Sequence, residues 1–218
     1  MKILCLKSNV KKLRRNIRDY GIIVSFQKFL CSAFSPLFEI QTYLLYVVDL
    51  VKAAGDGRPA NGDFVFRFID PTEDALIAQI ENMEDWLQGK LKSKLEDGQK
   101  CLVALHNNST VAGFNLVCYT VFRIPLIKLN KPLRPFECFS EQITIHPRFR
   151  KKGLGTNLRY AVFNAMKNEG YHRMYGGTHI SNFANKSLTS KVGFKIFAKV
   201  SYVSVFGFSR VLISRRRK

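Results

Sequence analysis

The sequence predicts a mixed α+β fold, in which helices flank a central sheet and a helical extension precedes it. Two observations carry this prediction. Strand-like and helix-like runs alternate along the chain after a glycine- and proline-rich stretch at 52–63. Of the 218 residues, 46% are hydrophobic and 12% are aromatic, which is enough for a substantial core. We therefore expect residues 1–60 to be the helical N-terminal extension and residues 61–218 to be one domain.

The formal net charge of +19 is extreme for a chain of this length. This excess of lysine and arginine predicts an acidic partner, namely a nucleic acid, an anionic membrane surface or a phosphorylated small molecule. The five cysteines are scattered, odd in number and never spaced as Cys-x-x-Cys. Because this pattern favours neither a disulfide framework nor a zinc site, we expect a cytoplasmic location and no metal.

The N-terminal region is basic over residues 1–20 and then apolar with polar interruptions. No uninterrupted apolar run reaches the roughly 20 residues of a membrane span, and no small-residue cleavage site follows a short apolar core. Residues 9–34 have the pattern of a helix with a basic first half and an apolar second half, which can lie on an anionic membrane. Two interpretations stay open. Residues 1–50 contact the inner face of a membrane peripherally, or these helices pack on the main domain or on a second copy in a homodimer.

The first half of the expected domain contains a strand, two helical stretches and a hairpin. "FVFRFID" at 64–70 alternates apolar with polar residues, and the acids after Pro71 are typical of a helix start. "EDWLQGKLKSKL" at 84–95 continues as a second helical stretch. Two apolar strands flank the turn-forming "HNNST" within 101–121, which predicts a hairpin. Residues 123–135 hold three prolines and several basic residues, so we expect a surface loop there.

The second half contains further strands around two helices. "FECFSEQITIHP" at 136–147 indicates a strand that a proline closes. Apolar residues recur at helical spacing over 153–169, and the stripe consists of Leu154, Leu158, Val162 and Ala165. "YHRMYGGTHI" at 171–180 predicts a strand, "NFANKSLTSKV" at 182–192 a short helix, and residues 193–214 a closing pair of strands.

A basic, glycine-rich turn stands directly before the helix predicted at 153–169, within "HPRFRKKGLGTNL". The first backbone N–H groups of a helix have no partner inside it, and the helix dipole adds partial positive charge there. Glycine lets a ligand approach the backbone closely, so this turn predicts an anion site. The turn lacks the Gly-Lys-Ser/Thr of a P-loop. It also follows a hairpin-rich half instead of opening a parallel unit, which argues against a dinucleotide fold.

Three local motifs and the order of the elements carry a family resemblance. The turn is Arg150-Lys151-Lys152-Gly153-Leu154-Gly155, and the strand before it ends in Ile143-Thr144-Ile145-His146-Pro147. Near the C-terminus, Asn182 precedes a short helix and Gly193-Phe194. In this order and spacing, residues 64–212 resemble the GNAT superfamily of acyl-coenzyme A-dependent N-acyltransferases.

The resemblance implies a mostly antiparallel sheet of six to seven strands, in which the strand before the turn splays from the strand after the helix. It implies acetyl-CoA, or another acyl-CoA, as co-substrate, with N–H groups of the turn holding the pyrophosphate. The exposed edge of the preceding strand would pair with the pantetheine arm. The residues implied at the coenzyme are Ile143, Ile145, Arg150, Lys151, Lys152, Gly153, Leu154, Gly155, Thr156 and Asn182. Each group has an alternative interpretation. The lysines are solvated surface charges, the isoleucine side chains are part of the core, and Asn182 fixes the loop.

Acyl transfer to nitrogen needs a base, because an ammonium group has no lone pair with which to attack. The family often carries an acid at the position of Glu141, which strand alternation places on the same face as Ile143 and Ile145. An ordinary carboxylate at the rim is the alternative. Glu137 shares this face but lies further from the slot. His179 is a second candidate, since its pKa is ordinarily near neutrality, and a histidine bonded to a nearby loop is its alternative.

The family frequently has a tyrosine in the last helix that protonates the leaving thiolate. The corresponding residue is Thr189, whose hydroxyl is a much weaker acid than a phenol. Water or Tyr175 would then protonate the thiolate, or the thiolate leaves unaided.

The acceptor is expected to be an anionic small molecule, such as an amino sugar on a nucleotide or lipid carrier. Basic side chains gather where the acceptor would bind, namely Arg123, Lys128, Lys131 and Arg134. Two rival functions stay open. One is a catalytically weak acyl-CoA sensor, which Thr189 makes conceivable. The other is a nucleic-acid-binding module, which the net charge favours but the dispersed basic residues and the lack of a recognition motif disfavour.

Overall fold

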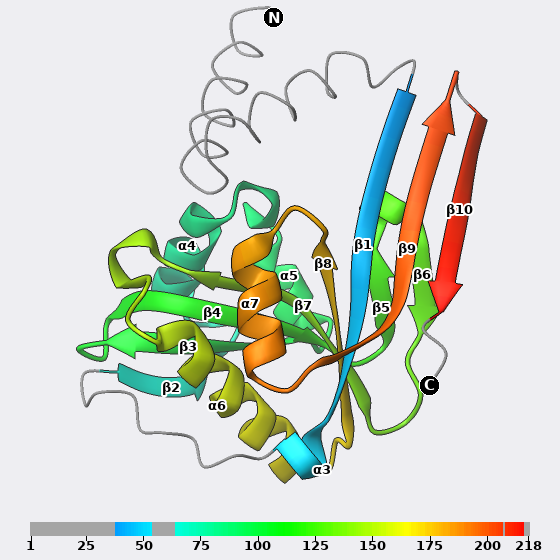
Figure 1. Cartoon of the computed structure of the whole chain (residues 1–218). Helices are drawn as coiled ribbons and strands as arrows, with labels where there is room; N and C mark the ends of the chain where they lie inside the picture. Colours follow the sequence, from blue (N-terminus) through cyan, green and yellow to red (C-terminus); the bar gives the residue numbers. More distant parts are fainter. Residues whose placement is uncertain (1–37, 54–63, 207, 216–218) are drawn as a thin grey trace, which may run out of the picture.

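The computed structural model describes residues 38–53, 64–206 and 208–215, which form one large sheet covered by helices (Figure 1). Within these residues there are ten strands: β1 (Phe38–Asp49), β2 (Phe64–Phe68), β3 (Lys100–His106), β4 (Thr110–Cys118), β5 (Val121–Ile124), β6 (Leu129–Pro132), β7 (Glu137–Ile145), β8 (Arg173–His179), β9 (Lys195–Val205) and β10 (Phe208–Arg215). The α-helices are α3 (Leu50–Ala53), α4 (Asp74–Met83), α5 (Leu91–Glu96), α6 (Leu154–Asn168) and α7 (Phe183–Lys191). Short 3-10 turns are η1 (Asp85–Leu87), η2 (Pro125–Ile127) and η3 (Pro147–Phe149).

Eight of these strands form a single sheet in the order β10-β9-β1-β8-β7-β4-β3-β2, and β5 and β6 form a separate hairpin. All pairs in the large sheet are antiparallel except β7 with β8. This arrangement confirms the predicted mixed α+β fold with a mostly antiparallel sheet. In Figure 1, β1, β9 and β10 project as a long arm beyond the body that the helices cover.

The parallel pair β7 and β8 is joined only at one end. Its register runs from Glu137 opposite Arg173 to Ser140 opposite Gly176, and it stops there. After Ser140, residues 142–145 of β7 keep their pairing with β4 on one edge, while β8 pairs with β1 on its far edge. The two strands therefore part after Ser140, as the resemblance implied, and leave one edge of β7 open.

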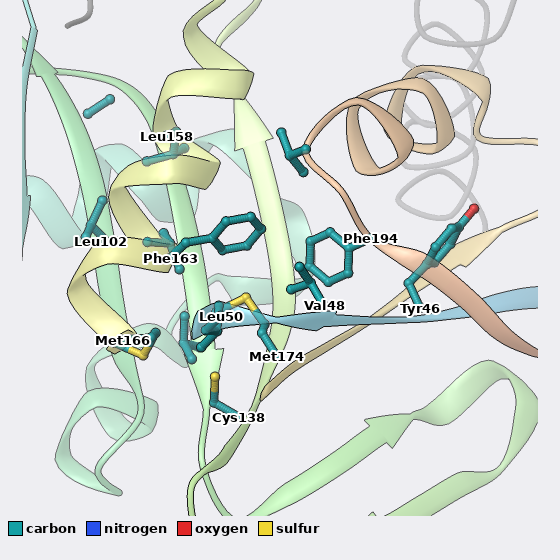
Figure 2. Close-up of a cluster of buried hydrophobic side chains, with 14 of the residues drawn as sticks. Tyr46, Val48, Leu50, Leu102, Cys138, Leu158, Phe163, Met166, Met174 and Phe194 are labelled. Atoms are coloured by element: carbon teal, nitrogen blue, oxygen red, sulfur yellow. The ribbon is translucent and has the colours of Figure 1, made fainter. Parts of the chain in front are cut away.

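Helix α6 covers one face of the sheet with the amphipathic stripe that the sequence predicts. Leu154, Leu158 and Val162 are buried, and Phe163 and Met166 extend the same stripe toward the sheet (Figure 2). Each long apolar side chain fully removed from water stabilises the fold by about 1.5–3 kcal/mol. Helices α4 and α5 cover the opposite face, where Ile80, Leu91 and Leu95 pack against β3 and β4.

Strand β1 corrects the expectation that residues 1–60 form a helical extension. Residues 38–49 are instead an inner strand between β8 and β9, which brings the sheet to eight strands and not the six to seven implied. The segment "FEIQTYLLYVVD" is rich in aromatic and β-branched residues, which suit a strand that is partly buried. The peripheral membrane contact expected through residues 1–50 is not tested by this pairing and stays a prediction. The helix expected at 9–34 and most of the linker expected at 52–63 lie outside the described residues.

Residues 123–135, expected to be a surface loop, are largely built into the hairpin β5–β6 and the turn η2 between its strands. Phe122, Ile124 and Ile127 are buried against β1 and β9. The basic residues of the segment remain outside: Arg123, Lys128, Lys131 and Arg134 are exposed. Among the described helices, none is long and apolar enough to cross a membrane.

Candidate active site

The glycine turn before α6 has an unusual backbone conformation at two positions. Lys151 and Gly153 both have left-handed backbone, with φ of 64° and 80°. Side chains other than glycine rarely adopt this conformation, and strain of this kind gathers at functional sites. The N–H groups of Thr156 and Asn157 donate to Gly153 O at 3.0 and 3.2 Å, so they already serve the helix. The groups before them in the first turn have no partner in the helix and point out of its end.

The two glycines of the turn have different roles. A Cβ on Gly153 would meet nothing within 4 Å, so this glycine is needed for its backbone angle and leaves the turn open. A Cβ on Gly155 would lie 3.4 Å from Leu188 Cδ2 and 3.6 Å from Ile145 Cγ1. Gly155 therefore lets α6 pack closely on α7 and β7. The sequence motif alone does not show whether this glycine serves packing or the predicted anion site.

The turn is fixed to the open end of β7. Arg150 Nε donates to the carbonyl oxygen of Ile145 at 3.0 Å, while Lys151 and Lys152 are exposed. Leu154 is buried in the core, so only its backbone is available to a ligand. Ile143 and Ile145 are partly buried against the α6 cluster, which agrees with their alternative interpretation as core side chains. The turn and the unpaired edge of β7 thus form one continuous surface.

A β-bulge overturns the expected direction of Glu141. Leu116 pairs with Gln142 and Val117 pairs with Ser140, which leaves Glu141 as an extra residue in β7. A bulge breaks the strand alternation on which the expectation rested. Whereas Ile143 packs toward α6, the Glu141 carboxylate accepts from Lys94 Nζ on α5 at 2.9 Å, on the opposite face of the sheet.

Around this bulge, the α4–α5 face is polar. Lys94 also lies 5.4 Å from the ring centre of Trp86. Nearby, the Glu84 carboxylate accepts from Thr144 Oγ1 at 2.8 Å and from Gln142 Nε2 at 3.3 Å. A pocket of about 340 Å³ begins beside this network and is lined by Gln79, Asn82, Met83, Glu84, Thr110, Val111, Thr144, His146, Pro147 and Arg150. This face therefore has room and polar groups for a second substrate.

A tyrosine and a carboxylate meet where β7 and β8 are still paired, before they part at Ser140. We call this the closed end of the splayed strands. Tyr175 Oη donates to Glu137 Oε1 at 2.9 Å, and its ring stacks on Phe122 of the β5–β6 hairpin. Burial, and then the hydrogen bond to Glu137, raise the pKa of Tyr175. The phenol therefore remains protonated at neutral pH.

The other predicted residues near α7 make local structural contacts. Thr189 is buried, and its hydroxyl donates to Asn185 Oδ1 at 3.4 Å. Asn182 caps α7, because its side-chain oxygen accepts from the N–H of Asn185 at 3.1 Å. His179 Nδ1 lies 2.7 Å from Ser181 Oγ, and its ring meets Tyr43 edge-on at 5.3 Å. These contacts agree with the loop-anchoring alternatives for Asn182 and His179.

A buried polar cluster that was not predicted from the sequence lies between α6 and the sheet. Arg159 Nη1 donates to Asn115 Oδ1 at 3.0 Å and also to the hydroxyl of Ser140, and the guanidinium lies 5.5 Å from the ring centre of Phe194. Burial lowers the pKa of Arg159 to about 10, which still leaves it charged at neutral pH. One feature of the sequence could have indicated this cluster: Arg159 directly follows Leu158, within the apolar stripe of a helix that faces the core.

Comparison with protein-family models gives a match over residues 65–194, to the model described as the acetyltransferase (GNAT) family. A comparison with curated protein sequences finds no match.

Solved structures share the fold at low sequence identity. A tandem GNAT protein from the clavulanic acid biosynthesis pathway is 14% identical with a TM-score of 0.56, over 84% of this chain and 59% of its own. A GCN5-related N-acetyltransferase from Sphaerobacter thermophilus is 14% identical with a TM-score of 0.53, over 84% of this chain and 56% of its own. A glucosamine N-acetyltransferase region of a fungal multi-domain protein is 16% identical with a TM-score of 0.59, over 81% of this chain and 23% of its own. The chain therefore spans less than two thirds of the length of these structures.

Proposed function

The chain belongs to the acetyltransferase (GNAT) family, and from this premise we propose that it transfers an acetyl or other acyl group from acyl-CoA to a primary amine. One observation carries the proposal: the glycine turn stands at the open end of two strands that part after Ser140. A diphosphate at the turn and an extended arm along the free edge of β7 would bring a thioester to the point where the strands separate.

The residues of the turn fit the diphosphate of coenzyme A. Main-chain N–H groups of residues 151–155 are the proposed donors, together with the hydroxyl of Thr156. The N–H of Thr156 is left out, since it already donates to Gly153. Lys151 and Lys152 add exposed positive charge beside this position, and the open backbone edge at Ile143 and Ile145 would pair with the pantetheine arm.

Glu141 is the proposed base, although it reaches the reaction from the face opposite to the one expected. The amine nitrogen attacks the thioester carbonyl carbon, the C–S bond breaks, and the proton of the amine passes to the Glu141 carboxylate directly or through water. The ion pair with Lys94 keeps this carboxylate beside the bulge. The thiolate leaves with its electron pair and takes a proton from water or from Tyr175. His179 remains the second candidate base, and the buried Thr189 is not proposed as an acid.

The proposed acceptor is an anionic amine, such as an amino sugar on a nucleotide or lipid carrier. It would approach from the α4–α5 face, where Glu141 and the polar pocket lie. The exposed Arg123, Lys131 and Arg134 on and beside the β5–β6 hairpin support a negatively charged acceptor, because they would repel a polyamine or a basic peptide.

A catalytically weak acyl-CoA sensor is the second candidate. Thr189 favours it, because this residue stands where the family frequently has a tyrosine that protonates the thiolate. Three further expectations stay predictions: a cytoplasmic location, a homodimer, and peripheral membrane contact through residues 1–50.

Measuring thiol release from acetyl-CoA with and without a panel of amines tests the function, with calorimetry of coenzyme A binding in parallel. We expect micromolar to millimolar coenzyme binding and thiol release that depends on an anionic amine. Binding without amine-dependent release at any pH would favour the sensor. Absence of coenzyme binding would overturn both functions.

A further inference from the structure

Arg159 places a positive charge at the closed end of the splayed strands. Its partner Ser140 is opposite Gly176, the last pair before β7 and β8 separate. Arg159 is 4% exposed and belongs to α6, the helix that the glycine turn begins. Ser140 lies about 16 Å of extended strand from Ile145, where the turn is attached. The guanidinium and the turn therefore stand at opposite ends of the open edge of β7.

No carboxylate balances this buried charge in the part of the chain that the structure describes. The nearby acids are engaged elsewhere: Glu141 pairs with Lys94, Glu137 with Tyr175 and Arg173, and Glu169 with Lys100. A buried arginine is costly unless it is paired, and an apolar side chain would pack in its place without that cost. The charge is thus unexplained by packing alone.

The unused edge of the guanidinium has the geometry for a carboxylate. Nη1 is occupied by Asn115 and Ser140, whereas the buried Nε atom has no hydrogen-bond partner within the described residues. The N–H groups along the Nε edge of arginine are parallel and match the two oxygens of a carboxylate. An anion with two oxygens in one plane would satisfy this edge.

We propose that Arg159, held by Asn115 and Ser140, binds the terminal carboxylate of a dicarboxylic acyl group, such as malonyl or succinyl, carried on coenzyme A. This inference rests on the proposed acyltransferase function and names its acyl donor. The carboxylate belongs to the donor and not to the acceptor, because Arg159 lies on the α6 face with Ile143 and Ile145. The acceptor side is the opposite face, where Glu141 meets α5.

Succinyl-CoA and butyryl-CoA test the proposal, because their acyl chains have the same number of carbons and differ at the terminal carboxylate. Calorimetry on the full chain should show succinyl-CoA binding about tenfold or more tightly than butyryl-CoA, as expected for a charge-assisted pair. Thiol release with the active amine should show the same preference. Arg159→Met should remove the preference by weakening succinyl-CoA alone, and Arg159→Lys should keep part of it.

Comparable affinity of the wild-type chain for both compounds would overturn the inference while leaving the acyltransferase intact. This comparison needs no variant, so it holds even if Arg159→Met fails to fold. If neither compound nor coenzyme A binds, the proposed function itself fails, and the two failures are distinguished.

Discussion

The two ends of β7 form sites of opposite construction. At one end, the turn of residues 150–156 is contiguous, largely exposed and made of main-chain N–H groups. At the other end, Asn115, Ser140 and Arg159 come from three elements, are buried, and act through their side chains. A main-chain site requires a run of permissive residues and so leaves a motif in the sequence. A side-chain site assembled by packing leaves only isolated polar residues among apolar ones.

The two sites would recognise different parts of the acyl-CoA donor. A turn that binds the diphosphate would bind every acyl-CoA alike, whereas the closed end would determine which acyl group is accepted and would hold the reacting groups. Changes at the turn should therefore alter affinity for every acyl-CoA. Changes at the closed end should alter turnover or acyl preference.

The largest expected effect is that of Gly153→Glu. A side chain here is strained by the φ of 80° and places a carboxylate beside the diphosphate. We expect coenzyme A affinity to fall about a hundredfold or more in calorimetry, since at least two charge-assisted hydrogen bonds are lost. Gly98→Glu is the matched control, because Gly98 has a φ of 86° and equally open surroundings but lies between α5 and β3. Equal losses in both variants would rule out the turn as the diphosphate site.

Next in size is the effect of Glu141→Gln at the closed end. Removing the base should lower kcat about a hundredfold, flatten the pH–rate profile and leave coenzyme affinity near the wild-type value. Steady-state rates across pH, together with calorimetry, measure all three. Asp74→Asn removes a carboxylate–lysine pair of the same length at a more exposed position, Asp74 with Lys92 at 2.9 Å, and should leave kcat, the pH profile and coenzyme affinity unchanged. A normal pH profile in Glu141→Gln would exclude this residue as the base and direct attention to His179.

Gly155→Val should reduce stability, because the turn end is also a packing site. The added methyl groups would press on Leu188 and Ile145, which already lie at contact distance from a Cβ at this position. We expect a loss of about 1–3 kcal/mol in the free energy of unfolding, measured by urea denaturation. An unchanged urea midpoint would contradict this expectation and show that α7 moves away to accommodate the larger side chain.

The smallest expected effects are those of replacing each of the two glycines by alanine on the free energy of unfolding. Gly153→Ala should cost about 1 kcal/mol, because alanine pays for left-handed backbone that glycine adopts freely. Gly155→Ala should be neutral or slightly stabilising, since it sits in helical backbone with ordinary contact distances. The same denaturation curves compare them, and a reversed order would contradict the roles assigned to the two residues.

Local patterns predicted much of this molecule, and long-range pairing decided the rest. The glycine turn, the α6 stripe and the 101–121 hairpin depend on neighbouring residues, so the sequence indicated them correctly. In "SEQITI" only the last three residues alternate apolar with polar, and three polar residues precede them. The bulge at Glu141 arises from a register shift against β4, which the strand's own sequence does not encode. Arg159 was missed because its partners lie on strands β4 and β7, 44 and 19 residues away.

Strand β1 was misassigned for a related reason. Its apolar residues follow a segment with helical periodicity, and its strand character depends on partners far along the chain. Because β8 and β9 lie near the C-terminal end, no pattern within residues 38–49 identifies them.

The insertion of β1 between β8 and β9 also governs the order in which the chain can fold. Thr42 and Ser201 share a hydrogen bond across 159 residues, so β1 is synthesised well before the strands with which it pairs. Such non-local pairing slows folding and exposes an apolar strand in the meantime. Expression of a fragment that starts at residue 61 would remove this strand and leave two facing edges unpaired, which invites aggregation during synthesis.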